Sequence, residues 1–228
     1  MLIRPFWGGF LHRIFISPSG IVENAPSHLD IPTYDGKNQC THPDVIEFTE
    51  PWQCYKYWMV MTPYPDYNQR YENPSVVASN DGRSWEVPPG LTNPIVPAPL
   101  PEQDYHNDPE IVYHDVYNEL WIYYQLVNSR DNQIEVKLTK SSDGAHWSKP
   151  INILNIPVFQ WTSPSIIKQG NLFKVWTVNA GAEGRLGNGV IGTIKEYIEA
   201  LYYMTRKMIP LRYGIPQPIE RGTGILDM

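Results

Sequence analysis

The chain has 228 residues, a net charge of −6 at pH 7 and a pI near 5.5. Because it is acidic and contains no cluster of lysine or arginine, we expect no nucleic-acid partner. No segment approaches the ~20 apolar residues of a membrane span, so no membrane insertion is expected. With 42% hydrophobic residues, 22 prolines and 16 glycines, the composition indicates a globular protein of short elements and turns.

The first 40 residues are weakly patterned and contain one predicted strand, at residues 13–16. Arg4, Pro5 and His12 interrupt the apolar opening segment, which therefore lacks the continuous core of a secretion signal. No clear signal peptide is expected. The sequence does not determine where the protein is located, and it is compatible with a virion-associated or an extracellular protein. Cys40 and Cys54 permit one disulfide, but two free thiols are the favoured interpretation.

From residue 42 onward, β-branched and aromatic runs bounded by Pro, Gly, Asn and Asp predict a series of strands. The first block contains VIEF, YKYWMVMT and SVVASN, and it ends in the turn SNDG followed by Trp85. Residues 88–106 carry six prolines and cannot form a central strand, so they are interpreted as a connection. The second block contains EIVYH, LWIYYQLV and IEVKLTK, and it ends in SSDG followed by Trp147.

A third series begins with SIIKQ and LFKVWTV, but the pattern then changes after Ala180. Over residues 190–208, apolar side chains such as Ile194, Ile198 and Leu201 recur at helical spacing, and Pro210 would end such a helix. The sequence therefore predicts a β-rich domain at 1–180 and a C-terminal extension at 181–228 that contains a short helix near 190–208.

The two blocks repeat one pattern with a period near sixty residues. Pro43 and Pro109 of the strands that lead into each block are 66 residues apart, and Pro164 of the third lead-in follows 55 residues later. This period suits one propeller blade of four antiparallel strands. The fold class predicted is all-β, a β-propeller that is incomplete or atypical, since only two full blades and part of a third can be counted.

The Ser-x-Asp-Gly turns that close the blocks are expected to be structural. Glycine supplies the positive φ of a tight hairpin, and the aspartate can accept hydrogen bonds from backbone amides of the turn. The following tryptophan can pack back onto the blade. Asp81 and Asp143 are therefore interpreted as turn residues rather than as catalytic groups.

These turns resemble the S-x-D-G-x-x-W turns of the arabinanase, xylosidase and invertase group of five-bladed propeller glycosidases, and more distantly the Asp-box turns of sialidases. The motifs that open the lead-in strands, NDPEI at 107–111 and THPDV at 41–45, are similar to the Asp-Pro motifs of the innermost strands in that group. Segments of the first block are also similar to phage tail proteins. The resemblance covers about 40–180, and it implies a propeller that binds or acts on an oligo- or polysaccharide in its axial funnel.

Aligning the three prolines places chemically useful residues at equivalent positions. Side chains two residues apart on a strand share a face, so the residues before and after each proline would converge on the funnel. These positions hold His42 and Asp44, Asp108 and Glu110, and Ser163 and Ser165.

The resemblance implies glycoside hydrolysis, which needs a protonated carboxylic acid and a second carboxylate. Asp44 is the candidate base, and Glu110 is the candidate acid, since burial beside a like charge would raise its pKa. Asp108 would orient the acid or the sugar. The related enzymes commonly carry a third carboxylate from a later blade, where this chain has Ser163 and Ser165, so the sequence leaves open whether the chain hydrolyses its ligand. The alternative is a non-catalytic glycan-binding or structural module of a phage tail or cell surface, in which such residues only cap turns.

The remaining candidates would bind the sugar. Tyrosine and tryptophan offer an apolar face with a polar edge, and polar side chains at strand starts can hydrogen-bond hydroxyls. The candidate ligand-binding residues are His42, Tyr71, Glu72, Asn73, His106, Trp161 and Ser163. The scattered histidines assemble no zinc-type spacing, so neither a metal site nor a cofactor is expected, although a central calcium ion stays open. Protein partners stay unknown.

Overall fold

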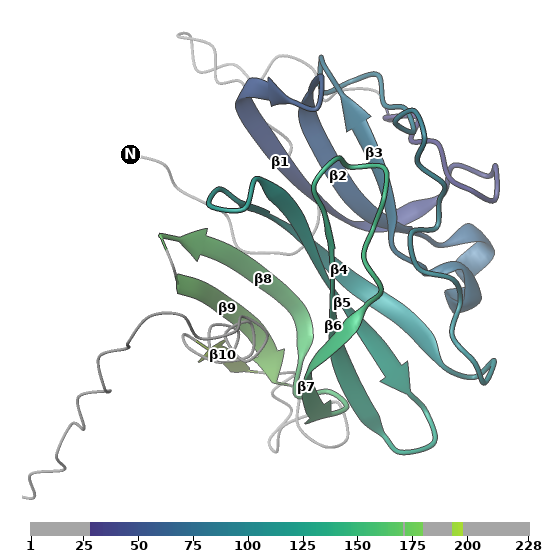
Figure 1. Ribbon diagram of the computed structural model, residues 1–228. Coiled ribbons are helices and arrows are strands. Elements are labelled where there is room, and N and C mark those ends of the chain that lie inside the picture. Colours follow the sequence, from purple (N-terminus) through teal and green to yellow (C-terminus); the bar gives the residue numbers. More distant parts are fainter. Residues whose placement is uncertain (1–27, 171, 180–192, 198–228) are drawn as a thin grey trace, which may run out of the picture.

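The computed structural model describes residues 28–170, 172–179 and 193–197. This part of the chain forms three antiparallel sheets with two short 3-10 helices, which confirms the all-β class (Figure 1). Cys40 and Cys54 are free thiols. No helix in these ranges is long and apolar enough to cross a membrane.

The sheets follow one another along the chain, and each begins with a lead-in strand. The first sheet comprises β1 (Cys40–Trp52), β2 (Tyr55–Pro63) and β3 (Ser75–Ser79), with the 3-10 helices η1 (Pro65–Tyr67) and η2 (Gln69–Tyr71) between β2 and β3. The second comprises β4 (Tyr105–His114), β5 (Glu119–Asn128), β6 (Gln133–Ser141) and β7 (Ile151–Pro157). The third comprises β8 (Thr162–Gln169), β9 (Leu172–Asn179) and β10 (Thr193–Tyr197). Within the described residues, the second sheet has the four strands expected of a blade, whereas the first and third have three each.

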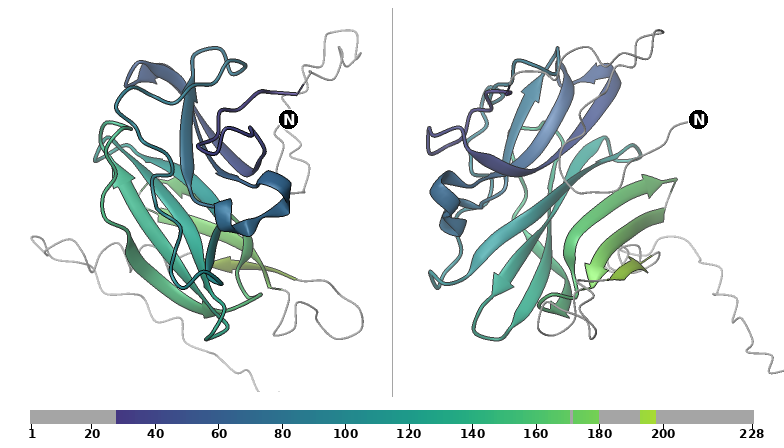
Figure 2. Two further views of the ribbon diagram at one scale, coloured as in Figure 1. Left: turned by 90° about the vertical axis from the view of Figure 1, so that its right-hand side faces the viewer. Right: turned by 180° about the vertical axis from the view of Figure 1, so that it is seen from behind.

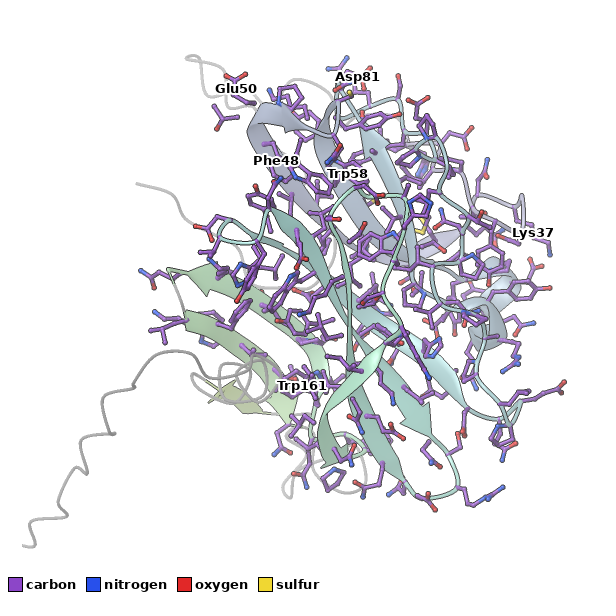
Figure 3. The ribbon with its side chains drawn as sticks, in the orientation of Figure 1. Lys37, Phe48, Glu50, Trp58, Asp81 and Trp161 are labelled. Carbon is purple, nitrogen blue, oxygen red and sulfur yellow. The ribbon has the colours of Figure 1, made fainter. Side chains whose placement is uncertain are left out.

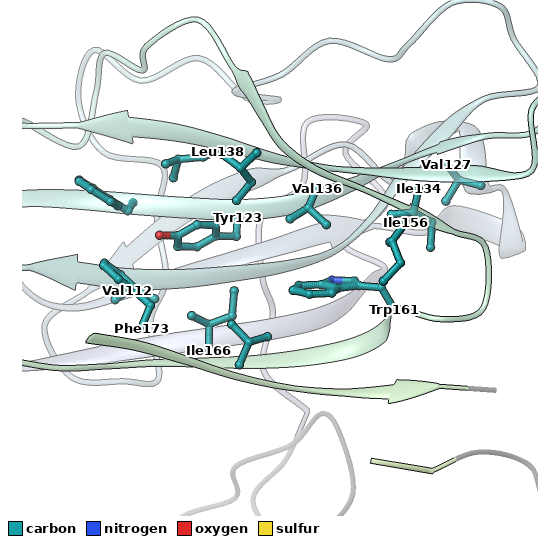
Figure 4. Packing of buried hydrophobic residues seen from close by; sticks show 13 residues of the cluster. Val112, Tyr123, Val127, Ile134, Val136, Leu138, Ile156, Trp161, Ile166 and Phe173 are labelled. Carbon is teal, nitrogen blue, oxygen red and sulfur yellow. The ribbon is translucent and has the colours of Figure 1, made fainter. Parts of the chain in front are cut away.

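The three sheets stack face to face, with the second between the other two (Figures 1 and 2). The lead-in strands are neighbours, because β4 contacts both β1 and β8. One hydrophobic cluster, which includes Trp58 and Ile122, lies between the first and second sheets. A second cluster, which includes Tyr123 and Phe173, lies between the second and third sheets (Figure 4). The sheets do not close a ring within the described residues, so a complete propeller stays a prediction.

The strand β10 corrects the helix expected near 190–208. Thr193–Tyr197 pairs antiparallel with β9, with Thr193 opposite Asn179 and Tyr197 opposite Val175. Threonine, isoleucine and tyrosine favour strands, and pairing with the edge of β9 outweighs the helical spacing of the apolar residues. The rest of the expected helix lies outside the described residues. The boundary at residue 180 stays a prediction.

The two Ser-x-Asp-Gly turns have the geometry expected of structural turns. The Asp81 carboxylate accepts hydrogen bonds from the amides of Arg83 and Ser84, both at 2.7 Å, and these bonds hold its pKa well below the ordinary value. Asp81 lies at the upper edge of the first sheet in Figure 3. Asp143 accepts the equivalent bonds from its own turn. Gly82 and Gly144 have φ of 71° and 78°, as a tight turn requires.

Candidate functional site

The three lead-in strands share a distortion immediately before their proline. His42, Asp108 and Ser163 have positive φ values of 51°, 45° and 46°. At each of these residues the register with the neighbouring strand shifts. Such a bulge redirects a side chain, and a left-handed φ is uncommon for residues other than glycine. The positions aligned by sequence are therefore structurally equivalent.

Two of these positions take part in a cluster that we call the acidic centre, formed by His42, Glu72 and Asp108. The His42 Nε2 lies 3.2 Å from Asp108 Oδ1, and His42 Nδ1 lies 3.7 Å from Glu72 Oε1. The carboxylates of Glu72 and Asp108 are buried, whereas the His42 side chain is partly exposed. The acidic centre thus combines residues from β1, from the loop before β3 and from β4.

Asp108 is held firmly by its surroundings. Its Oδ2 accepts hydrogen bonds from the Gln125 side chain and from the Ser163 backbone amide, both at 2.8 Å. Its Oδ1 faces His42. Ser163 therefore contributes its amide to this arrangement. Gln125, in the middle of β5, was not foreseen from sequence, because an isolated glutamine in an aromatic strand carries no signal of function.

Glu72 differs from Asp108 in its hydrogen bonding. Burial and the charge of Asp108 raise the pKa of Glu72 to about 7. In the part of the chain that the structure describes, no group donates a hydrogen bond to the Glu72 carboxylate, and His42 Nδ1 has no hydrogen-bond partner. A carboxyl group that titrates near neutral pH and has an unsatisfied imidazole nitrogen beside it is suited to proton transfer.

Asp44 and Glu110 lie on the neighbouring strands β1 and β4, but each carboxylate accepts a hydrogen bond from a backbone amide outside the acidic centre. Asp44 Oδ2 accepts a hydrogen bond from the Ile111 amide at 2.8 Å, and Glu110 Oε2 accepts one from the Ile166 amide at 3.0 Å. Each carboxylate therefore links its own lead-in strand to the next one. Burial raises the pKa of Asp44, and burial together with the charge of Asp44 raises that of Glu110. Their assignment as catalytic base and acid stays a proposal.

Asn73 and His106 lie next to the acidic centre, and their side chains are hydrogen-bonded to each other. The His106 Nδ1 is 3.0 Å from Asn73 Oδ1. Asn73 Nδ2 donates to the Tyr34 hydroxyl at 2.9 Å. Burial is the main cause that lowers the pKa of His106 to about 3, so the ring is neutral. Tyr34 was not foreseen, since it lies more than thirty residues from either partner in sequence.

The two predicted aromatic ligands differ in exposure. Tyr71 is 38% exposed, and its ring lies 6.3 Å from that of Tyr34, so it remains available to a ligand. Trp161 is 1% exposed and packs in the hydrophobic cluster between the second and third sheets (Figure 4). Its ring offers no face to a sugar, because it fills the space between the sheets. The expectation for Trp161 is corrected accordingly.

Within the described ranges, no group of three or more His, Cys, Asp or Glu side chains is disposed to hold a metal ion. A central calcium ion stays a prediction.

Comparison with known proteins identifies carbohydrate-active relatives. No family model matches the chain. It is 41% identical over 143 residues to an A type blood N-acetyl-alpha-D-galactosamine deacetylase of Flavonifractor plautii, a match that covers 59% of this chain and 18% of the relative. The crystal structure of an N-acetylgalactosamine deacetylase from F. plautii, in complex with blood group B trisaccharide, matches with a TM-score of 0.70 and 30% identity. That match covers 76% of this chain and 55% of the solved one.

A more distant structure matches in fold alone. The alpha-L-arabinofuranosidase Arb93A of Fusarium graminearum has a TM-score of 0.50 and 16% identity, over 70% of this chain and 46% of its own. The described sheets are thus arranged as in propeller-type glycoside hydrolases and in the deacetylase. The chain spans only part of the length of each of these proteins.

Proposed function

We propose that this chain forms part of a carbohydrate-active protein whose acidic centre removes the acetyl group from an N-acetylated amino sugar, with a terminal N-acetylgalactosamine as the first candidate. The proposal rests chiefly on Glu72, a buried carboxyl group with a pKa of about 7 that lies beside His42 and Asp108. The names of the F. plautii relatives supply the substrate class. The exposed Tyr71 near the centre offers an aromatic face to the sugar.

Hydrolysis of an acetamide needs a base for the attacking water and an acid for the departing nitrogen. In our proposal, Glu72 accepts the proton of a water molecule as its oxygen adds to the acetyl carbonyl carbon. The same carboxyl then gives that proton to the sugar nitrogen as the C–N bond breaks, leaving acetate and a free amine. Asp108 orients the His42 ring through Nε2, so that Nδ1 faces Glu72.

The test is to identify the products. The purified chain is incubated with an oligosaccharide that ends in N-acetylgalactosamine, and acetate, free amine and released sugar are each measured by NMR. We expect acetate and amine in equal amounts without sugar release. Glu72→Gln should lower the rate about 100-fold or more, because general base catalysis contributes about 10²–10⁴-fold. Glu102→Gln, in an exposed loop, is the matched control. Unchanged acetate release by Glu72→Gln would overturn the assignment.

Glycoside hydrolysis is the second candidate, and Glu110 favours it. Its raised pKa beside the Asp44 carboxylate is the electrostatic pattern of an acid and base pair. In the same assay this activity would appear as released sugar without acetate, and Glu110→Gln would abolish it. Binding of the oligosaccharide without either product would indicate a non-catalytic glycan-binding module.

A further inference from the structure

We infer that Tyr34, Asn73 and His106 form a positioning network that fixes Glu72 relative to Asp108. The inference rests on the proposed function of the acidic centre, because it assigns these three residues to the same reaction. None of them is proposed to touch the reacting atoms. Their effect is exerted through the backbone that carries the two buried carboxylates.

The network joins the two elements that hold the carboxylates. Asn73 directly follows Glu72, and His106 precedes Asp108 by two residues on β4. The 3.0 Å contact between His106 Nδ1 and Asn73 Oδ1 therefore ties the loop that carries Glu72 to the strand that carries Asp108. Both side chains are almost fully buried, at 3% and 2% exposure. A hydrogen bond shielded from water in this way is costly to break.

The direction of each hydrogen bond follows from the partners of Asn73. Its Nδ2 donates to the Tyr34 hydroxyl at 2.9 Å and to the Arg70 carbonyl at 3.0 Å, so both amide hydrogens are used. The Oδ1 atom must then accept, and His106 must carry its hydrogen on Nδ1. Burial, with the charges of Lys137 and Arg70, keeps the His106 ring neutral. His106 therefore donates this bond without exchanging protons with Glu72 near neutral pH.

Tyr34 extends the network to the other side of Glu72. Its hydroxyl donates to the Tyr71 carbonyl at 2.9 Å, so the residues before and after Glu72 are both held. Since no described group donates to the Glu72 carboxylate itself, its position depends on these neighbouring bonds. Misplacement of a reacting group by about 1 Å can cost about 10²-fold in rate, which makes such support important.

The test compares His106→Leu, which removes the donor, with His106→Asn, whose amide can replace Nδ1–H. Titration of the ¹³C-labelled Glu72 carboxyl by NMR is the primary measurement. In the wild-type chain it should titrate near pH 7. In His106→Leu the pKa should fall toward the ordinary ~4.3, because Glu72 moves away from Asp108 and toward water. His106→Asn should restore most of the raised pKa of Glu72.

The second measurement is the rate of deacetylation. The kcat should fall about 10–100-fold in His106→Leu, with a smaller change in KM.

The control is Val112→Ala, which removes buried side-chain atoms from the same strand without touching the network. It should lower stability and leave the Glu72 titration unchanged. If His106→Leu does not fold, Tyr34→Phe takes its place, with a smaller fall in the pKa of Glu72 expected. An unchanged titration in the folded variant would overturn the network. A shifted titration in a chain that releases no acetate would uphold the network and reject the proposed function.

Discussion

Asp44 and Glu110 show how a residue type can suit two roles. A carboxylate beside a proline at the start of an inner strand resembles a catalytic group of a propeller glycosidase. In the structure, each one accepts the amide hydrogen of the next lead-in strand. The two bonds are equivalent, since the donors Ile111 and Ile166 both stand two residues after their proline. This repetition indicates that the carboxylates hold adjacent sheets together, whatever else they do.

The role of Asp44 in holding the sheets leads to a stability prediction. Asp44→Ala leaves the Ile111 amide without its acceptor, and an unsatisfied buried donor costs about 1–3 kcal/mol. We expect the free energy of unfolding in urea to fall by that amount. Glu50→Ala, at an exposed position of the same strand, should change it by less than about 0.5 kcal/mol. Equal, small effects in both variants would mean that the bond from Ile111 does not support the fold.

At the scale of elements, the lead-in strands and closing turns could be predicted because their signals are local. Proline, glycine and aspartate at fixed spacing located the lead-in strands and the closing turns, and the structure contains both. The segment 193–197 could not be predicted in the same way. Its apolar spacing suits a helix, whereas the free edge of β9, a tertiary feature, makes it a strand.

The two closing turns provide a matched pair for a second prediction. A Cβ on Gly144 would lie 2.1 Å from the Trp58 ring, whereas a Cβ on Gly82 would lie 3.6 Å from Tyr57. Gly82→Ala should therefore cost only the left-handed backbone, about 1–2 kcal/mol. Gly144→Ala adds overpacking between the first and second sheets, for a total of about 2–5 kcal/mol. Thermal unfolding of both variants measures the difference. Equal losses would show that Trp58 moves freely away from the turn.

At the scale of the whole molecule, the sequence repeat located the lead-in strands but not the contacts between them. Alignment of the prolines placed His42 and Asp108 at equivalent positions, yet their 3.2 Å contact depends on how the first and second sheets stack. Glu72 and His106 were candidates for sugar binding only. Glu72 acquires its raised pKa, and His106 its lowered one, from burial that no local pattern reveals. Tyr34 reaches the site from a segment with no motif at all.

The measurement that tests the central claim most directly is the pH dependence of acetate release from a terminal N-acetylgalactosamine. A general base acts in its deprotonated form, and the pKa of Glu72 is about 7. We predict that kcat/KM rises as the pH increases through about 7, and that Glu72→Gln loses this rise together with the activity. A rise centred near the ordinary glutamate value of about 4.3, or no acetate release at any pH, would contradict the account.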